Sequence, residues 1–309
     1  VWNDSGKRTS DPARLHDPLG FNNRYWAARL AIRARAMGFR IMIDFHYSDT
    51  WADPGKQFIP HEWLGLPPEE VALRLYDFTY DTLHTMKEHG VTPEWVQVGN
   101  ETGGGIMWPL GQYWNAAQGG SWANLAMFFK SGYQAVKDVD SSIKVVIHHA
   151  ESGNLGATEW FYGQLVPNEI PWDVIGLSYY PQWHGSFDAM TNSMWQLAAI
   201  YNKPVMTVEG AHPWTTEGFD ETGNALGIPD NFIYPASVEG QIGYLDEVVT
   251  RIKSVPDGQG LGLIYWEPEW IALPGMLPTT TSNALGGAGW AIGEASGWEN
   301  AALFDQNGI

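Results

Sequence analysis

The chain has 309 residues, with 17 Lys and Arg against 35 Asp and Glu, so its formal charge is −18. Hydrophobic residues make up 44%, which suits a globular protein with a sizeable core and excludes an acidic disordered chain. The negative charge repels phosphate backbones, and we expect no Lys/Arg cluster that offsets it, so nucleic acid is excluded as a partner. We also expect no membrane partner, because no apolar run reaches the roughly 18 residues of a spanning helix. The absence of cysteine excludes disulfides and thiolate metal sites.

Short apolar segments alternate with longer segments of helical periodicity along the whole chain. The apolar segments are nearly continuous, as in strands that are buried on both faces. We expect strands at 40–45, 95–98, 143–147, 173–177, 204–208 and 261–266, and a stub at residues 1–2. The sequence shows no linker and no break in composition, so we predict a single domain over residues 1–309.

Four of the helical segments have readable ends. Asn23, Ser121 and Ser237 are residues that favour the N-cap position, and a Pro-Pro-Glu-Glu run at 67–70 begins another helix. Gly38 and Gly90 are suited to end two of them. The expected helices are 23–38, 67–90, 121–139 and 237–255. Strands that alternate with helices predict a parallel sheet with right-handed crossovers.

Polar or aromatic residues follow nearly every predicted strand at its carboxyl end. They are Asp44 and His46, Asn100 and Glu101, His148 and His149, Tyr179 and Tyr180, Glu209, and Trp266 with Glu267. A closed barrel presents all its strand ends in one ring, whereas an open sheet concentrates its site at one switch point. We therefore predict an α/β fold of the (β/α)8 (TIM) barrel type. The first strand and helix, and most of the second strand, would be missing from this chain.

Glu101 and Glu209 each lie just past a predicted strand, so a barrel would point both into one central pocket. Two carboxyls about 5 Å apart suit retaining glycoside hydrolysis, in which one protonates the leaving oxygen and the other attacks the anomeric carbon. The alternative is that each is an ordinary carboxylate at a strand end.

Several longer motifs carry a resemblance to a known family. Residues 44–57 read DFHYSDTWADPGKQ, 96–105 read VQVGNETGGG, and 178–185 read SYYPQWHG; VEG follows at 208–210, IYWEPEWI at 264–271 and GWENAALFD at 297–305. Together, and in this order, they resemble glycoside hydrolase family 53, the endo-β-1,4-galactanases that act on the galactan side chains of pectin. The resemblance implies a secreted, retaining endo-hydrolase of β-1,4-galactan that needs no cofactor, although no signal peptide is visible.

The resemblance implies a role for each matching residue. Glu101 would be the general acid/base, Glu209 the nucleophile, and Asn100 the ligand of the sugar 2-hydroxyl. Tyr180 would donate its hydroxyl to the nucleophile, although strand parity leaves Tyr179 open.

The other carried-over positions would contact substrate or shape the cleft. His46 would contact substrate with Asp44 orienting its neighbours, unless the two form a purely structural buried pair. Trp266 would be the sugar platform, and we predict a cis bond between Trp266 and Glu267. The remaining substrate-binding candidates are Trp51, Trp108, His148 and Trp183, of which the tryptophans could equally be packing residues.

The chain also departs from the family. Gly210 and His212 stand where the family usually has Thr and Tyr, which leaves the fine specificity open. Bacterial members of the family bind calcium, and the matching positions here are Asp220, Asn224, Ser296 and Glu299. These positions supply fewer oxygen ligands than calcium prefers, so a structural calcium ion is an expectation with an incomplete ligand set.

Three rival functions remain. A xylanase or mannanase would use the same two glutamates, and a non-catalytic sugar-binding module would need neither. A metal-dependent hydrolase would use histidines, but the sequence has no HExxH or HxH spacing. We expect a monomer whose partner is a polysaccharide.

Overall fold

The computed structural model describes residues 1–3, 22–219, 223–272, 297–305 and 307–309. These residues form two compact units. The first unit comprises residues 1–150 and 160–175, and the second comprises residues 151–159 and 176–309. The prediction of one catalytic domain stays a prediction.

Three parallel strands form the sheet of the first unit, and a fourth begins beside them. The strands are β1 (Met42–Phe45), β2 (Trp95–Val98), β3 (Lys144–His149) and the start of β4 (Val174–Ser178). Met42 is opposite Trp95, which in turn is opposite Lys144, so the carboxyl ends of the three strands lie level. The backbone N–H of Asp173 donates to Val145 O (2.8 Å), which joins the start of β4 to β3. This alignment places strand-end residues of neighbouring strands beside one another.

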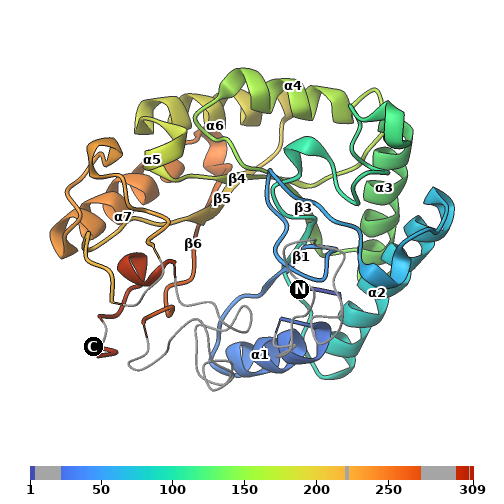
Figure 1. The fold of residues 1–309 in the computed structure, drawn as a ribbon, viewed down its shortest axis with the longest axis horizontal. Coiled ribbons are helices and arrows are strands. Elements are labelled where there is room, and N and C mark those ends of the chain that lie inside the picture. Colours follow the sequence, from blue (N-terminus) through green and yellow to red (C-terminus); the bar gives the residue numbers. More distant parts are fainter. Residues whose placement is uncertain (4–21, 220–222, 273–296, 306) are drawn as a thin grey trace. The chain divides into compact units, whose positions relative to one another are not determined.

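Helices alternate with the strands of the first unit, and local chemistry sets their ends. They are α1 (Arg24–Ala36), α2 (Pro68–Glu88), α3 (Trp122–Val139) and most of α4 (Leu155–Leu165), with short 3-10 turns η1 (His61–Trp63), η2 (Thr102–Gly104) and η3 (Ala116–Gln118). Asn23 Oδ1 accepts from two N–H groups of the first turn of α1, and Ser121 Oγ accepts from Asn124 N (3.1 Å). Helices α2 and α3 pack side by side (Figure 1) and bury their apolar faces.

The second unit has the same alternation of strands and helices. It contains the end of β4, β5 (Val205–Gly210), β6 (Gly260–Tyr265), α5 (Pro181–His184), α6 (Phe187–Tyr201), α7 (Val238–Lys253), and the 3-10 turns η4 (Pro229–Asn231), η5 (Pro256–Gly258) and η7 (Glu299–Ala301). Strands β5 and β6 are parallel, with irregular register between Val205 and Gly210. Ser237 Oγ caps α7 by accepting from Gly240 N (3.0 Å). Backbone bonding from Tyr179 N to Glu209 O (2.8 Å) joins the end of β4 to β5.

Most of the predicted elements are confirmed. All six strands form within a few residues of their predicted bounds, and the three predicted N-caps accept hydrogen bonds as expected. The stub is extended chain beside the end of β1, because His46 N donates to Val1 O (3.0 Å) and Asn3 N donates to Ser48 O (2.8 Å). The fold is α/β with parallel strands, and closure into an eight-stranded barrel stays a prediction.

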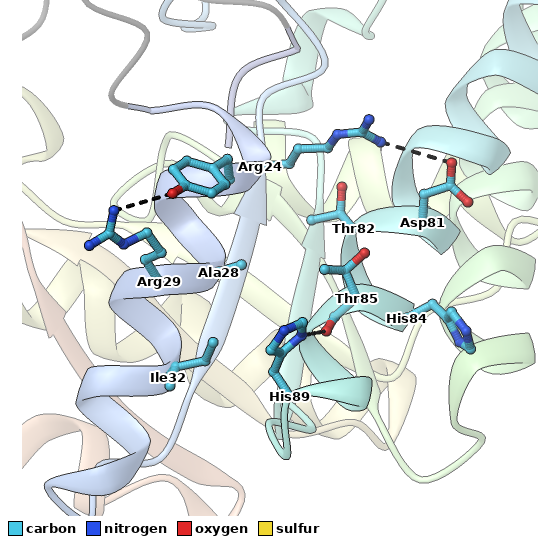
Figure 2. Close-up of a pocket in the computed structure, with 10 residues that line it drawn as sticks. Arg24, Ala28, Arg29, Ile32, Asp81, Thr82, His84, Thr85 and His89 are labelled. Carbon is cyan, nitrogen blue, oxygen red and sulfur yellow. Dashed lines mark hydrogen bonds and ion pairs between the residues drawn. The ribbon is translucent and has the colours of Figure 1, made fainter.

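One helix contradicts an expectation drawn from composition. Helix α1 carries four arginines, Arg24, Arg29, Arg33 and Arg35, and no acidic residue, so a basic cluster does exist. Figure 2 shows the pocket of about 410 Å³ that α1 lines together with α2. There Arg24 lies 3.9 Å from the Asp81 carboxylate, and Arg29 donates to the Tyr25 hydroxyl. In the described part of the chain, no helix is long and apolar enough to cross a membrane.

Candidate active site

The end of β1 carries Asp44 and His46, which form a hydrogen-bonded pair. His46 Nδ1 accepts from Ala52 N (2.9 Å), so the ring proton is on Nε2, which lies 3.1 Å from Asp44 Oδ2. Burial lowers the pKa of His46, and Asp44 only partly opposes this change. Burial opposes ionisation of Asp44, yet its pKa is still lowered because His46 lies beside it. A neutral His46, held through Nδ1 by Ala52 N–H, therefore donates from Nε2 to an ionised Asp44.

Asn100, after β2, is held by a network of amide side chains. Its Nδ2 donates to Ala52 O (2.9 Å), and its Oδ1 accepts from Gln97 Nε2 (3.1 Å). Gln97 Nε2 also donates to Asp44 Oδ1 (2.7 Å), which couples the ends of β1 and β2. Gln57 Nε2 donates to Asn100 O (2.7 Å) and approaches Glu101 O (3.4 Å). Asn100 thus has a fixed orientation and one further amide N–H.

Glu101 lies in a sharp turn between β2 and η2. Its backbone is left-handed, with φ 49° and ψ 52°, which is uncommon for a residue with a Cβ atom. The turn begins at Gly99 (φ 84°), where an added Cβ would lie 2.6 Å from Thr102 Cγ2. Thr102 Oγ1 donates to His148 O (2.8 Å) and ties the turn to β3. Strained backbone of this kind is concentrated at functional sites.

His148, at the end of β3, contacts the same turn. Its Nδ1 lies 3.2 Å from Glu101 N and 3.1 Å from Asn100 Oδ1. Without a proton, Nδ1 accepts from the Glu101 N–H; with a proton, it donates to Asn100. His148 is fully buried. Through these hydrogen bonds the structure brings together, within the first unit, Asp44, His46, Asn100, Glu101 and His148.

The two candidate cleft tryptophans of the first unit, Trp51 and Trp108, lie near these residues. Trp51 packs edge-on against the ring of His46 (5.3 Å between centroids) and against Trp2 (5.2 Å). Trp108 donates from Nε1 to Gly104 O (3.0 Å), which fixes its ring against the glycine-rich turn after Glu101. Trp114, which is well exposed, packs edge-on against Trp108 (6.1 Å).

In the second unit, Glu209 near the end of β5 accepts a short hydrogen bond from a tyrosine. Tyr180 Oη donates to Glu209 Oε1 at 2.6 Å, and both side chains are buried. Tyr179 turns the other way and donates to Gly185 O (3.0 Å), so parity is decided in favour of Tyr180. His184 Nδ1 accepts from Tyr180 N (3.1 Å) and holds this tyrosine's backbone. A short hydrogen bond to a carboxylate favours its ionised form.

Three tryptophans surround Tyr180. The rings of Trp183 and Trp298 lie 5.2 and 5.3 Å from that of Tyr180, and Trp266 lies 6.0 Å from Trp298. Trp183 is half exposed, so part of this cluster reaches solvent. Flat indole surfaces of this kind suit contact with the apolar face of a sugar.

The predicted cis bond between Trp266 and Glu267 is wrong. Among the described residues the cis bond is Trp108–Pro109. The chain turns after β6 through a positive φ of 46° at Glu267 instead. Burial, with a smaller contribution from Glu269, raises the pKa of Glu267 to about 8.

Of the four predicted calcium positions, Asp220 and Ser296 lie outside the described residues, so the structure places Asn224 and Glu299. Asn224 Oδ1 is buried and meets no donor in the described part of the chain, while its Nδ2 donates to Glu217 O (3.0 Å). Glu299 is buried and accepts from Phe219 N. Ala225 N donates to Gly297 O (2.7 Å), so the loops that carry Asn224 and Glu299 are joined. Oxygen atoms suit calcium, and the buried Asn224 oxygen fits that use.

Three residues were missed by sequence reasoning. Gln57 and Gln97 are nearly fully buried and orient Asn100, and a polar residue inside an apolar strand was the available signal for Gln97. Trp298 lies in a quoted motif but was assigned no role. Glu101 belongs to the first unit and Glu209 to the second, so their pairing stays a prediction.

The strand ends of this parallel α/β fold carry carboxylates, an oriented asparagine and exposed tryptophan. These features are typical of glycoside hydrolases. Comparison with known proteins agrees. The family model for glycosyl hydrolase family 53 matches residues 1–309, and the chain belongs to this family.

Named relatives extend the likeness. The arabinogalactan endo-β-1,4-galactanase of Cellvibrio japonicus is 37% identical over 99% of this chain and 82% of its own length. The endo-β-1,4-galactanase of Bacillus subtilis is 34% identical over 94% of this chain and 69% of its own. The solved family 53 catalytic domain of Ignisphaera aggregans superposes with a TM-score of 0.87 and 35% identity, covering 100% of this chain and 80% of that one.

Proposed function

We propose that the protein is an endo-acting, retaining hydrolase of β-1,4-galactan in which Glu209 is the nucleophile and Glu101 the general acid/base. Membership of family 53 and relatives named as endo-β-1,4-galactanases support this substrate. The observation that carries the assignment of Glu209 is the 2.6 Å hydrogen bond from the buried Tyr180 hydroxyl to its carboxylate.

The Tyr180 bond suits a nucleophile for two reasons. It favours the ionised carboxylate, which is the form that attacks. It also holds Oε1 in place, and so fixes the orientation of the carboxylate that attacks the anomeric carbon. In the first step, Glu209 would form a glycosyl-enzyme ester while Glu101 gives its proton to the leaving oxygen. In the second step, Glu101 would take a proton from water, and that water would hydrolyse the ester with net retention.

The surroundings of Glu101 support its role as the acid/base. A fixed turn, held by Gln57 and Thr102, would keep its carboxyl at one position throughout both steps. The remaining N–H of Asn100 would bind the sugar 2-hydroxyl. Asp44, held by His46 and Gln97, would accept from a further sugar hydroxyl, so His46 would act through Asp44.

The aromatic side chains would hold the polysaccharide. Trp266 would stack at the cleavage subsite, and half-exposed Trp183 would extend the platform. Trp51 and Trp108 would form the wall on the side of Glu101. This arrangement needs no organic cofactor.

Paired substitutions test the two carboxylates. Glu209→Gln is expected to abolish turnover and leave the thermal transition unchanged. Glu101→Gln is expected to slow galactan far more than an aryl galactoside whose leaving group needs no proton. Equal losses on both substrates would remove Glu101 from the acid role. Proton NMR of the first product is expected to show the β-anomer.

A second test separates galactan from xylan and mannan. Gly210 and His212 are the reason to make it, because they lie next to Glu209. Reducing-sugar release is expected from galactan alone when the three polymers are assayed in parallel. Faster release from xylan or mannan would contradict galactan as the substrate but would leave the proposed two-glutamate mechanism standing.

We also propose that a calcium ion joins the loops that carry Asn224 and Glu299, with Asp220 and Ser296 as further ligands. The ion would act on stability, so chelation is expected to lower the melting temperature, and calcium but not magnesium is expected to restore it. An unchanged melting temperature would exclude the ion.

We further propose that the enzyme acts outside the cell, because its polymeric substrate lies there. We also propose that it is a monomer. Galactanase activity in the culture medium after removal of the cells tests the localisation. Light scattering of the purified protein tests the oligomeric state.

A further inference from the structure

Tyr244 on α7 is a buried tyrosine that the catalytic proposal does not use. Its ring is fully buried, and its hydroxyl donates to Tyr179 O at 3.0 Å. We propose that Tyr244 is a positioning residue that sets the place of the Tyr180 hydroxyl on Glu209. This inference rests on the proposed function, because it assumes that Glu209 is the nucleophile.

The segment 179–180 is held from both sides. Tyr179 N donates to Glu209 O (2.8 Å), while Tyr179 O accepts from Tyr244. The next residue, Tyr180, carries the hydroxyl that reaches Glu209 Oε1. The Tyr244 bond therefore fixes the peptide group that joins Tyr179 to Tyr180, and a tilt of this peptide would move the Tyr180 ring. Small shifts of a group that orients a reacting atom have large effects on rate.

Gly210 gives Tyr244 its access. A Cβ atom at residue 210 would lie 2.7 Å from Tyr244 Oη and 2.7 Å from Tyr179 O, so a side chain there would clash with both partners of the bond. Gly210 directly follows Glu209 on β5. The absence of a side chain at Gly210 therefore leaves the space that the Tyr244 hydroxyl occupies beside Glu209.

His212 completes the arrangement from the other side of the ring. Its imidazole stacks on Tyr244 at 5.3 Å with an angle of 16° between the planes. Gln241, one turn before Tyr244 on α7, donates to His212 O (2.9 Å) and holds the loop after β5. Gly210 thus leaves room for the Tyr244 hydroxyl, and His212 packs on the Tyr244 ring.

The test is a double-mutant cycle of Tyr244→Phe and Tyr180→Phe on galactan. Tyr244→Phe keeps the ring and is expected to lower kcat roughly tenfold with KM within about twofold. In the Tyr180→Phe background the same change is expected to have no further effect on kcat, because the hydroxyl it positions is gone. Additive losses, or a Tyr244→Phe enzyme with unchanged kcat, would overturn the proposal.

Two further measurements separate this role from a merely structural one. Tyr201→Phe removes another tyrosine hydroxyl that donates to a backbone carbonyl, Glu159 O (3.0 Å), and is expected to leave kcat unchanged. A crystal structure of Tyr244→Phe is expected to show the Tyr180–Glu209 distance lengthened from 2.6 Å; an unchanged distance would refute the positioning role. An inactive wild-type enzyme would refute the proposed function alone, since the crystallographic distance still decides the role of Tyr244.

Discussion

Glu267 makes the stability of this protein depend on pH in a direction opposite to that of most carboxylates. Its pKa is raised from the ordinary 4.5 to about 8, first by burial and then by Glu269. Between these values the folded state keeps a proton that the unfolded state has released. The free energy of unfolding therefore falls as the pH rises from about 4.5 to about 8. Removing the charge with Glu267→Gln should remove this loss.

The magnitude follows from the same two pKa values. Each pH unit across the window is worth about 1.4 kcal/mol, so the full interval corresponds to about 5 kcal/mol. The side chain is only partly buried by area, and water reaches part of it, so we take about half of this value. We expect Glu267→Gln to be more stable than the wild type by about 2 to 3 kcal/mol at pH 8.5. At pH 5 the two proteins should agree within about 0.5 kcal/mol.

Urea unfolding at pH 5, 6.5 and 8.5 measures this difference, and other titrating groups cancel between the two proteins. Glu269→Gln is the matched control. It removes the smaller cause of the shift, so its gain at pH 8.5 should be smaller than that of Glu267→Gln. A stability difference that stays constant with pH, or a wild type that gains stability as the pH rises, would refute the reasoning.

Three further predictions concern single contacts. Gln57→Leu should lower kcat on galactan roughly tenfold, because the backbone carbonyl of Asn100 loses its donor. Gln112→Leu changes another buried glutamine and should leave kcat unchanged. Equal losses of kcat in both enzymes would contradict the role of Gln57. His184→Asn should remove an acid sensitivity: burial lowers the pKa of His184 to about 4, so the wild type loses stability as the pH falls from 6.5 towards 4, by about 2 kcal/mol. Urea titrations of both proteins at pH 4.5 and 7 check this, and parallel curves would disprove it. Ser237→Ala should cost about 1 kcal/mol through the lost cap of α7, measured by thermal unfolding at neutral pH, whereas Ser237→Thr should restore most of it.

The sequence predicted the elements well because their signals are local. A capping hydroxyl or amide acts on N–H groups two or three residues away, so Asn23, Ser121 and Ser237 marked helix starts correctly. Continuous apolar runs marked the strands. Helices α4 and α6 were not predicted. Helix α4 is rich in apolar residues and has a weak helical pattern, whereas Ser186 was an available N-cap signal for α6.

The candidate site was predicted as a set of residue types but not as a set of contacts. Strand-end positions could be read for Asp44, Asn100, Glu101 and Glu209. The sequence left Tyr179 and Tyr180 open, because a shift of one residue reverses the face of a strand. The hydrogen bond to Glu209 decided in favour of Tyr180.

By itself, the sequence determined the family, the order of strands and helices, and the acidic side chains that follow the strands. Tertiary structure alone decided which groups hold those side chains. Gln57 meets Asn100 across 43 residues of chain, and Tyr244 meets Tyr179 across 65. Secondary structure depends on interactions between near neighbours in the chain. The partners of a buried polar group depend on how distant segments pack, and only the folded chain sets that packing.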